Sequence, residues 1–278
     1  MKWTLLFLII SSCQLGFHQK RILTHEPVMK LCFLGDVGKD SPTQGQVALA
    51  LQDEQCHAVF FAGDIIYPKG LQFAGDKEGE EKFFKYYRPL TNKDHRPQLH
   101  IALGNHDYQS NPDVWTRIAE QDPSVYAPAR YFSEDFGGVC VTTLDTQLAI
   151  FPFEYIRQKG QSRWLSQEKK KFKDCTVKIA LGHHPYRYPR VRKFLKDEVF
   201  GVFDYYIAGH EHFMSYERIK DQTEQFITGA GGTPDHGHLP GYLTMTIEKK
   251  AETFEVLTEI NKISPRGQVT REKFRRSF

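Results

Sequence analysis

Five short motifs rich in aspartate, asparagine and histidine stand out in this chain, and each directly follows a short apolar run. They are residues 35–38 (Gly-Asp-Val-Gly), 63–67 (Gly-Asp-Ile-Ile-Tyr), 104–107 (Gly-Asn-His-Asp), 181–183 (Leu-Gly-His) and 209–212 (Gly-His-Glu-His). Carboxylate, amide and imidazole side chains are common metal ligands. If the apolar runs are strands of an open α/β sheet, their carboxyl ends meet at the edge where such folds bind ligands. The motifs therefore predict a metal centre with enough donors for two ions.

The elements that would position these motifs can be followed along the chain. Unbroken apolar runs predict buried strands at residues 28–34, 57–62 and 99–103, and helical spacing predicts helices at 44–54 and 78–87. Buried parallel strands typically appear in a sequence as continuous hydrophobic runs. The alternation of strand and helix therefore predicts parallel pairing with right-handed crossovers.

The second half of the chain is richer in strands. After a helical stretch near residues 114–120, strands are predicted at 131–132, 139–144, 177–181, 205–208, 225–228, 242–247 and 253–259, with one helix at 162–173 that Ser162 would cap. Both halves bring donors to one edge, which predicts an α/β fold of two facing mixed β-sheets flanked by helices. No linker rich in proline, glycine or serine divides residues 28–263, so we expect them to form one domain.

The composition is that of an ordinary globular protein. The chain has 278 residues, of which 40% are hydrophobic and 26% are charged, and this length is enough for one large domain with a full core. The net charge of +3 is too small to indicate nucleic-acid binding. The last segment, residues 264–278, is basic and polar, and we expect a solvated tail there.

The N-terminus has the features of an export signal. Lys2 precedes an apolar run at residues 3–10 that is too short to span a bilayer, and small residues follow it. Residues 10–13 (Ile-Ser-Ser-Cys) also resemble a bacterial lipobox, in which Cys13 would carry a lipid. Residues 1–27 are thus expected to be a signal plus tether of a periplasmic or extracellular protein. Membrane attachment through a lipidated Cys13 and an ordinary cleaved signal remain alternatives.

Four further cysteines occur in the chain, namely Cys32, Cys56, Cys140 and Cys175. No C-x-x-C spacing is present, so a thiolate zinc site is not indicated. The sequence leaves the pairing of these cysteines open.

In the order of its motifs the chain resembles the metallophosphoesterases, and within them the small, single-domain purple acid phosphatases of the tartrate-resistant type. The resemblance runs from about residue 29 to residue 259 and includes Leu-Asp-Thr at 144–146, Trp-Leu at 164–165 and Gly-Ala-Gly at 229–231. Tyr67 is its most specific mark, because other metallophosphoesterases usually carry an aspartate motif there. The resemblance implies a four-layer sandwich of two sheets and outer helices.

The resemblance also implies the metal ligands. One ion would take Asp36, Asp64, Tyr67 and His212, and the other would take Asp64, Asn105, His183 and His210, so that Asp64 bridges the two. A phenolate with carboxylates suits Fe(III), whereas imidazoles with an amide oxygen suit a divalent ion such as Fe(II), Zn(II) or Mn(II). Two such ions would hold a hydroxide that attacks phosphorus in line with the leaving oxygen.

Residues beside the ligands are assigned to the substrate by the same resemblance. His106 is expected to bind the phosphate and to protonate the leaving oxygen as a general acid, and Asp107 is expected to orient it. His184 stands where relatives often carry tyrosine, so it either replaces a second substrate-side histidine or packs in the interior. Arg187 either holds the phosphate in a bidentate contact or is simply solvated.

These features together predict a binuclear metal-dependent phosphatase that hydrolyses phosphate monoesters, with a small phosphoester as its partner. A phosphodiesterase of the same superfamily, acting on nucleotide or cyclic diesters, is the first alternative, because in-line attack serves both reactions. A non-catalytic phosphate-binding protein tethered to the cell envelope is the second.

Overall fold

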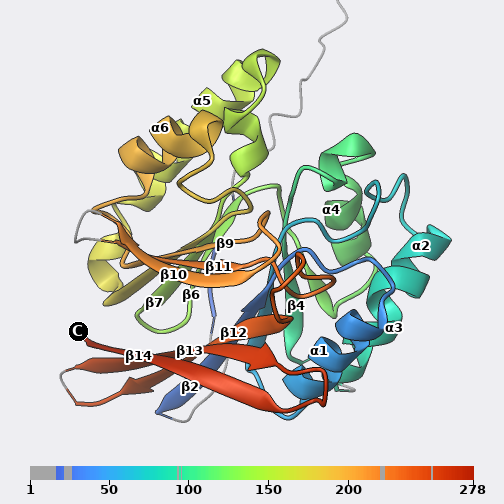
Figure 1. Cartoon of the computed structure of the whole chain (residues 1–278). Helices are drawn as coiled ribbons and strands as arrows, with labels where there is room; N and C mark the ends of the chain where they lie inside the picture. The colour runs from blue at the N-terminus through green and yellow to red at the C-terminus, as the bar shows by residue number, and fades with distance from the viewer. Residues whose placement is uncertain (1–16, 22–26, 93, 95, 220–222, 252) are drawn as a thin grey trace, which may run out of the picture.

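The computed structural model describes residues 17–21, 27–92, 94, 96–219, 223–251 and 253–278. Two seven-stranded sheets face each other, and helices cover the outer face of each (Figure 1). The predicted fold of two facing mixed sheets flanked by helices is therefore confirmed. The predicted signal and Cys13 lie outside the described residues.

The first sheet contains the strands of the N-terminal half together with the C-terminal strands. Its order is β14 (Val269–Ser277), β13 (Phe254–Ile263), β12 (Gly241–Lys249), β2 (Val28–Leu34), β3 (Ala58–Ala62), β4 (Gln98–Ala102) and β5 (Val125–Tyr126). Strands β2 to β5 pair in parallel, as the apolar runs predicted, whereas β12, β13 and β14 pair antiparallel.

The second sheet is built from the middle of the chain and from the described N-terminal segment. Its order is β1 (Phe17–Lys20), β6 (Phe132–Asp135), β7 (Val139–Thr143), β8 (Val177–Leu181), β9 (Tyr205–Ala208), β11 (Thr223–Thr228) and β10 (Met214–Ile219). Strands β7, β8, β9 and β11 are parallel to one another. The carboxyl ends of β8 and β9, like those of β2 to β4, lead into the motifs.

The helices form the two outer layers of the molecule. The first sheet carries α1 (Pro42–Gln52), the continuous helical segment α2 (Lys77–Gly79), η1 (Glu80–Phe84), α3 (Lys85–Tyr87) and η2 (Arg88–Leu90), and then α4 (Val114–Ala119). The second sheet carries η4 (Thr146–Ala149), η5 (Pro152–Glu154), α5 (Tyr155–Glu168), η6 (Phe172–Asp174) and α6 (Pro189–Glu198). A third apolar cluster fills the space between the sheets. The layers therefore follow the order helix, sheet, sheet, helix.

Several predicted elements differ from the structure. Helix α5 begins at Tyr155 rather than at residue 162, so Ser162 lies inside the helix and the prediction that it caps the N-terminus is wrong. Residues 264–278 are not a tail, because Val269–Ser277 forms β14 and pairs with β13, although most of its side chains are exposed. Part of the expected N-terminal tether, Phe17–Lys20, is strand β1, which pairs with β6.

Two disulfides join the four cysteines, Cys32 to Cys56 and Cys140 to Cys175. Each one links a strand to the turn that precedes its parallel neighbour in the same sheet. Disulfides persist in oxidising compartments, which fits an exported protein. Within the described part of the chain, no helix has the length and apolar character that a membrane span requires.

Candidate metal centre

The seven predicted ligands all follow strand ends, and they come together at one edge of both sheets. Three of them have backbone φ angles in the left-handed region: Asp36 at 58°, Asp64 at 53° and His210 at 70°. Such angles are costly for residues other than glycine and cluster at functional sites. Hydrogen bonds hold the strained segments in place, because the N–H of His210 donates to Asp36 Oδ2 at 2.8 Å and the N–H of His106 donates to Asp64 Oδ1 at 2.8 Å.

Three of the other ligands surround the phenol oxygen of Tyr67. This oxygen lies 2.9 Å from Asp36 Oδ1, 3.0 Å from Asp64 Oδ2 and 3.1 Å from His212 Nε2. His212 Nε2 lies 3.4 Å from Asp36 Oδ1. This group is the set that the resemblance assigned to the first ion, and its four donor atoms lie close enough together to face one cation.

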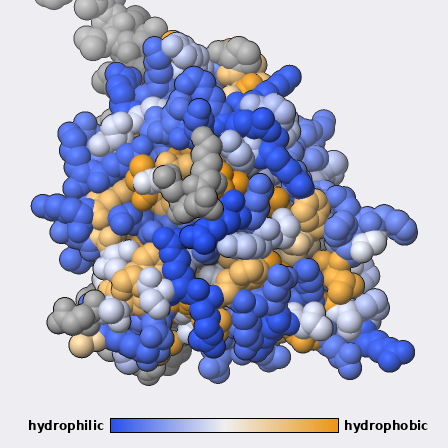
Figure 2. Space-filling view, turned by 60° about the vertical axis from the view of Figure 1, so that its left-hand side comes forward, coloured by the Kyte–Doolittle hydropathy of each residue, from blue (hydrophilic) through white to orange (hydrophobic). Residues whose placement is uncertain are grey.

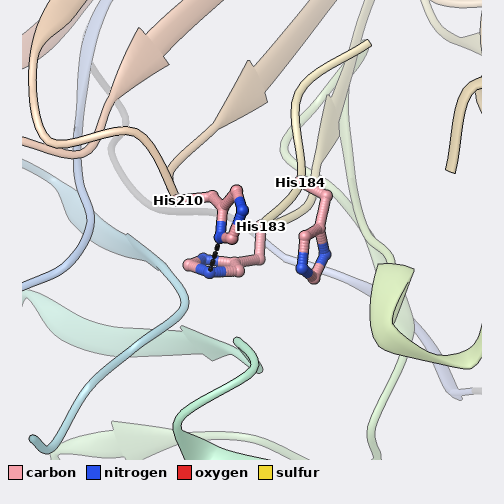
Figure 3. Close-up of side chains that lie close together, drawn as sticks. All are labelled: His183, His184 and His210. Carbon is pink, nitrogen blue, oxygen red and sulfur yellow. Dashed lines mark hydrogen bonds between the residues drawn. The ribbon is translucent and has the colours of Figure 1, made fainter. Parts of the chain in front are cut away.

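A second group forms around the amide oxygen of Asn105. His183 Nε2 and His210 Nδ1 lie 3.1 and 3.0 Å from Asn105 Oδ1, and 3.3 Å from each other. Figure 3 shows the rings of His183 and His210 meeting at these nitrogens. His183 Nε2 also lies 3.4 Å from Asp64 Oδ2, the same oxygen that lies near Tyr67. Asp64 therefore belongs to both groups, as a bridging ligand would.

The surroundings of the ligands fix their orientation. His183 Nδ1 lies 2.8 Å from the carbonyl oxygen of Ala62 and donates to it, so the free Nε2 faces the cluster. Glycines keep the space open for the carboxylates. A Cβ on Gly104 would lie 2.2 Å from Asp64 Oδ1, and one on Gly209 would lie 2.6 Å from Asp36 Oδ2. Gly104 and Gly209 are therefore required by close approach to the ligands.

The charges of the cluster call for a cation. Burial alone would lower the pKa of His183, but the carboxylates of Asp64 and Asp36 outweigh burial and raise it to about 9. Burial and the same two carboxylates raise the pKa of Tyr67 far above its usual range. Burial and the charge on His183 lower the pKa of His210 to about 4. Protonated His183 thus offsets one carboxylate charge, while the neutral phenol of Tyr67 only hydrogen-bonds to Asp36 and Asp64. Metal cations between these donors would replace these protons. The donor set fits two ions.

His106 lies beside this cluster and is partly open to solvent. Its side chain is 27% exposed, and its Nε2 lies 3.9 Å from Asp64 Oδ2. Its Nδ1 lies 2.5 Å from the carbonyl oxygen of Pro68, and its ring packs on that of Tyr67 with centroids 4.3 Å apart. A contact between Nδ1 and this carbonyl directs Nε2 toward the space above the ligands.

The carboxylate of Asp107, which is expected to orient His106, contacts other groups in the structure, so that role stays a prediction. The Asp107 carboxylate is buried and accepts hydrogen bonds from three backbone N–H groups, those of Gly104 at 2.8 Å, Asp64 at 3.0 Å and Ile65 at 3.3 Å. Adjacent residues project in different directions, and Asp107 points into the loops while His106 points out of them. Asp107 instead joins the loops that follow β3 and β4, and the Pro68 carbonyl takes the orienting position on His106.

His184 and Arg187, the two further residues assigned to the substrate, have partners within the protein. His184 is 1% exposed, and its Nδ1 lies 2.8 Å from Thr146 Oγ1 (Figure 3). Burial and the neighbouring His183 and His210 lower its pKa well below the usual range. Arg187 is half exposed and forms an ion pair with Glu211. Both substrate-binding assignments stay predictions, and the burial of His184 fits the packing alternative.

Two charged neighbours of the site were missed by the sequence interpretation. Lys39 Nζ lies 4.5 Å from the centroid of the Tyr67 ring and 3.4 Å from His212 Nδ1. Asp235 Oδ1 lies 3.5 Å from the same nitrogen of His212. Lys39 directly follows the first motif, so its position near the ligands could have been predicted. Asp235 lies in a loop that contains none of the motifs.

The comparison with known families agrees with this geometry. Residues 29–214 match the calcineurin-like phosphoesterase family. The match covers more than half of the chain, and the chain belongs to this family of metallophosphoesterases. Members of the family typically bind two metal ions, and the described residues include groups that could hold a metal, among them Asp36, Asp64 and His183.

Particular relatives lie within the acid phosphatases. The chain is 24% identical over 206 residues to purple acid phosphatase 7 of Arabidopsis thaliana, a match that covers 65% of this chain and 62% of the plant enzyme. The chain thus spans less than two thirds of that relative. It is 22% identical over 271 residues to tartrate-resistant acid phosphatase type 5 of Oryctolagus cuniculus, covering 84% of this chain and 81% of that enzyme. The predicted resemblance is therefore confirmed.

Solved structures show the same fold at low identity. GAP50, described as the anchor in the inner membrane complex of Plasmodium, superposes with a TM-score of 0.69 at 18% identity, covering 89% of this chain and 88% of that one. A dimetal phosphatase from Danio rerio superposes with a TM-score of 0.55 at 12% identity, covering 90% of this chain and 99% of that one.

Proposed function

We propose that this protein is a binuclear metal-dependent phosphohydrolase that cleaves phosphate monoesters. The observation that carries the proposal is the overlap of the two donor groups at Asp64 Oδ2, which lies 3.0 Å from the phenol oxygen of Tyr67 and 3.4 Å from His183 Nε2. When bound there, two ions would supply Lewis acidity and an activated water. The acid phosphatases among its relatives support the choice of monoesters.

The chain's own residues have separate tasks in this proposal. The first group, with the phenol of Tyr67, suits Fe(III), and the second group suits Fe(II), Zn(II) or Mn(II). His106 would contact the transferring phosphoryl group and give a proton from Nε2 to the leaving oxygen, because its Nδ1 is engaged with Pro68. Asp107 would keep the loops carrying Asp64 and Asn105 in register.

The test separates this role of His106 from metal binding. His106→Ala should keep both ions, because its Nε2 is 3.9 Å from Asp64 Oδ2 and belongs to neither donor group. It should lose roughly 10²–10⁴-fold in rate, the usual span for a positioned general acid. The loss should be larger for alkyl than for aryl phosphates, because a poor leaving group needs the proton more. Elemental analysis that shows lost metal would instead make His106 a ligand or a structural residue.

Two further measurements distinguish the alternatives. The ratio of turnover on an aryl phosphate to turnover on its bis-aryl diester separates a monoesterase from a phosphodiesterase. An anchor protein such as GAP50 shares the fold, so a metal-loaded sample without turnover on either compound would favour a non-catalytic protein. The complete set of seven converging donors supports catalysis over that alternative.

A further inference from the structure

The described chain begins at the catalytic edge of the second sheet. Phe17 pairs with Phe132, Phe132 pairs with Thr143, and Thr143 pairs with Leu181, the strand residue just before the motif that contains His183. The first residue of β1 therefore lies in the same row as the strand ends that carry the metal ligands.

Helix α5 packs beside the start of β6, the strand that pairs with β1, and it is fixed to the catalytic edge. Tyr131, the residue before β6, packs on Trp164 of α5 with ring centroids 4.9 Å apart. Gln161 of α5 accepts from the N–H of Asp145 at 2.8 Å and donates to its carbonyl oxygen at 3.0 Å. Asp145 is the second residue after β7. Its two hydrogen bonds to Gln161 therefore hold α5 beside the loops that carry the ligands.

The start of α5 carries an exposed apolar tip. Phe153 is 76% exposed, Tyr155 is 55% exposed and Ile156 is 80% exposed. In the described part of the chain, no other segment of four residues exposes three large apolar side chains to this degree. The face in Figure 2 is largely hydrophilic with smaller hydrophobic areas, one of them at the top, the height at which α5 stands in Figure 1. An exposed apolar group with a polar rim typically marks an interaction site.

Basic side chains flank this apolar tip. Lys159 lies over the ring of Tyr155 at 4.4 Å, and Arg163 is exposed one turn further along α5. Within the described residues neither Lys159 nor Arg163 forms an ion pair, whereas Arg157 is paired with Glu154 at 3.0 Å. Two uncompensated positive charges thus accompany the apolar tip.

We propose that the apolar tip and the two basic side chains form a contact surface for a lipid bilayer that carries anionic lipids. Aromatic and aliphatic side chains beside lysine and arginine are the combination that binds the bilayer interface. The upstream chain fits this occupant, because Cys13, the expected lipid carrier, lies only four residues before Phe17. Four residues span at most about 14 Å, so a bilayer that holds a lipid on Cys13 lies within that distance of Phe17. The catalytic edge would then face the lipid headgroups.

Vesicle binding by the full chain tests this surface without any enzymatic readout. Phe153→Ser/Ile156→Ser should weaken binding roughly tenfold to hundredfold on vesicles of phosphatidylcholine, with or without phosphatidylglycerol. Lys159→Gln/Arg163→Gln should weaken it about 25-fold on vesicles with phosphatidylglycerol and leave pure phosphatidylcholine unchanged. Leu49→Ser is the matched control, because Leu49 is 65% exposed on α1, against the other sheet, and should bind as the wild type does.

A gain of signal complements these losses. Ile156→Trp should show a blue-shifted emission with anionic vesicles, and Leu49→Trp should not. Thermal unfolding confirms that each variant is folded. Equal vesicle binding by the wild type and both double variants would overturn the proposal and leave the N-terminus as the sole attachment. An effect of the patch variants on self-association in solution, with unchanged vesicle binding, would also overturn it in favour of a second copy of the chain.

Discussion

Replacing Asp107 by asparagine separates the two roles considered for this residue. If Asp107 served His106, the change would lower the catalytic rate and leave the fold intact. The structure places its carboxylate on the N–H groups of Gly104, Asp64 and Ile65 instead. We therefore expect Asp107→Asn to destabilise the protein and to weaken metal binding, because Asp64 is the ligand shared by both donor groups.

The magnitude follows from the three hydrogen bonds. Bonds to a buried charged acceptor contribute about 1.5–3 kcal/mol each, and neutral ones about 1 kcal/mol. Asparagine keeps one oxygen for the N–H groups of Gly104 and Asp64 but turns its amide group toward the N–H of Ile65. One bond is lost and two are weakened, while the repulsion between Asp107 and Asp64 is relieved. The expected net loss is about 2–4 kcal/mol in the free energy of unfolding.

Burial and the charge of Asp64 raise the pKa of Asp107 to about 7, so the loss applies above that pH, where the carboxylate is charged. Urea unfolding at such a pH, in the presence of a chelator, measures this loss without the contribution of bound ions. For a domain of this size the loss corresponds to a drop in Tm of roughly 5–10 °C. His106→Ala is the matched control and should lose less stability, about 1 kcal/mol, because its ring contacts Pro68 and Tyr67 but not the backbone groups that Asp107 joins. Wild-type stability in Asp107→Asn, together with the same rate loss as His106→Ala, would refute the reasoning and restore the orienting role.

Three further predictions follow from the site, two about metal ligands and one about a buried acid. Tyr67→Phe should bleach the purple or pink charge-transfer band expected of an iron-loaded protein, and a colourless wild type with full iron would exclude Tyr67 as a ligand. Asp64→Asn should lose more metal than Asn105→Ala, since only Asp64 touches both groups; equal metal content would contradict the bridge. Burial raises the pKa of Asp145 to about 6, so the folded protein keeps this proton at a pH where the unfolded chain has lost it. The stability of the wild type therefore falls as the pH rises from about 4 to about 6. Asp145→Asn should therefore gain about 3 kcal/mol of stability relative to the wild type over that range, and a pH-independent difference in urea unfolding would argue against it.

The sequence predicted which strand ends meet better than it predicted the outer elements. Each ligand motif combines an apolar run with a glycine and a donor. The parallel pairing of the strands brings their carboxyl ends together, regardless of the conformation of the loops. The left-handed angles of Asp36, Asp64 and His210 were not foreseeable, because they depend on hydrogen bonds between different motifs.

The missed elements are stabilised by contacts from distant parts of the chain. Strand β14 looks polar, yet Arg271 bonds Glu54 at 2.8 Å and Arg276 bonds Asp204 at 3.2 Å. The first turns of α5 expose Tyr155 and Ile156 and include Gly160, so they lack the apolar spacing of a buried helix. They are helical because Gln161 is tied to the backbone of Asp145. Local patterns carry no signal for such pairings.

Hydrogen bonds from backbone N–H groups also join the two donor groups, so the effects of two ligand variants on metal binding depend on each other. Asp36 belongs to the first group, but its Oδ2 accepts from the N–H of His210, a ligand of the second group. Asp64 Oδ1 likewise accepts from the N–H of His106 beside Asn105. Loss of Asp36 therefore releases the strained segment that carries His210, and loss of Asp64 releases the segment that adjoins Asn105. Residues coupled in this way are not additive, so removing Asp36 together with His210 should cost less metal affinity than the two single losses combined.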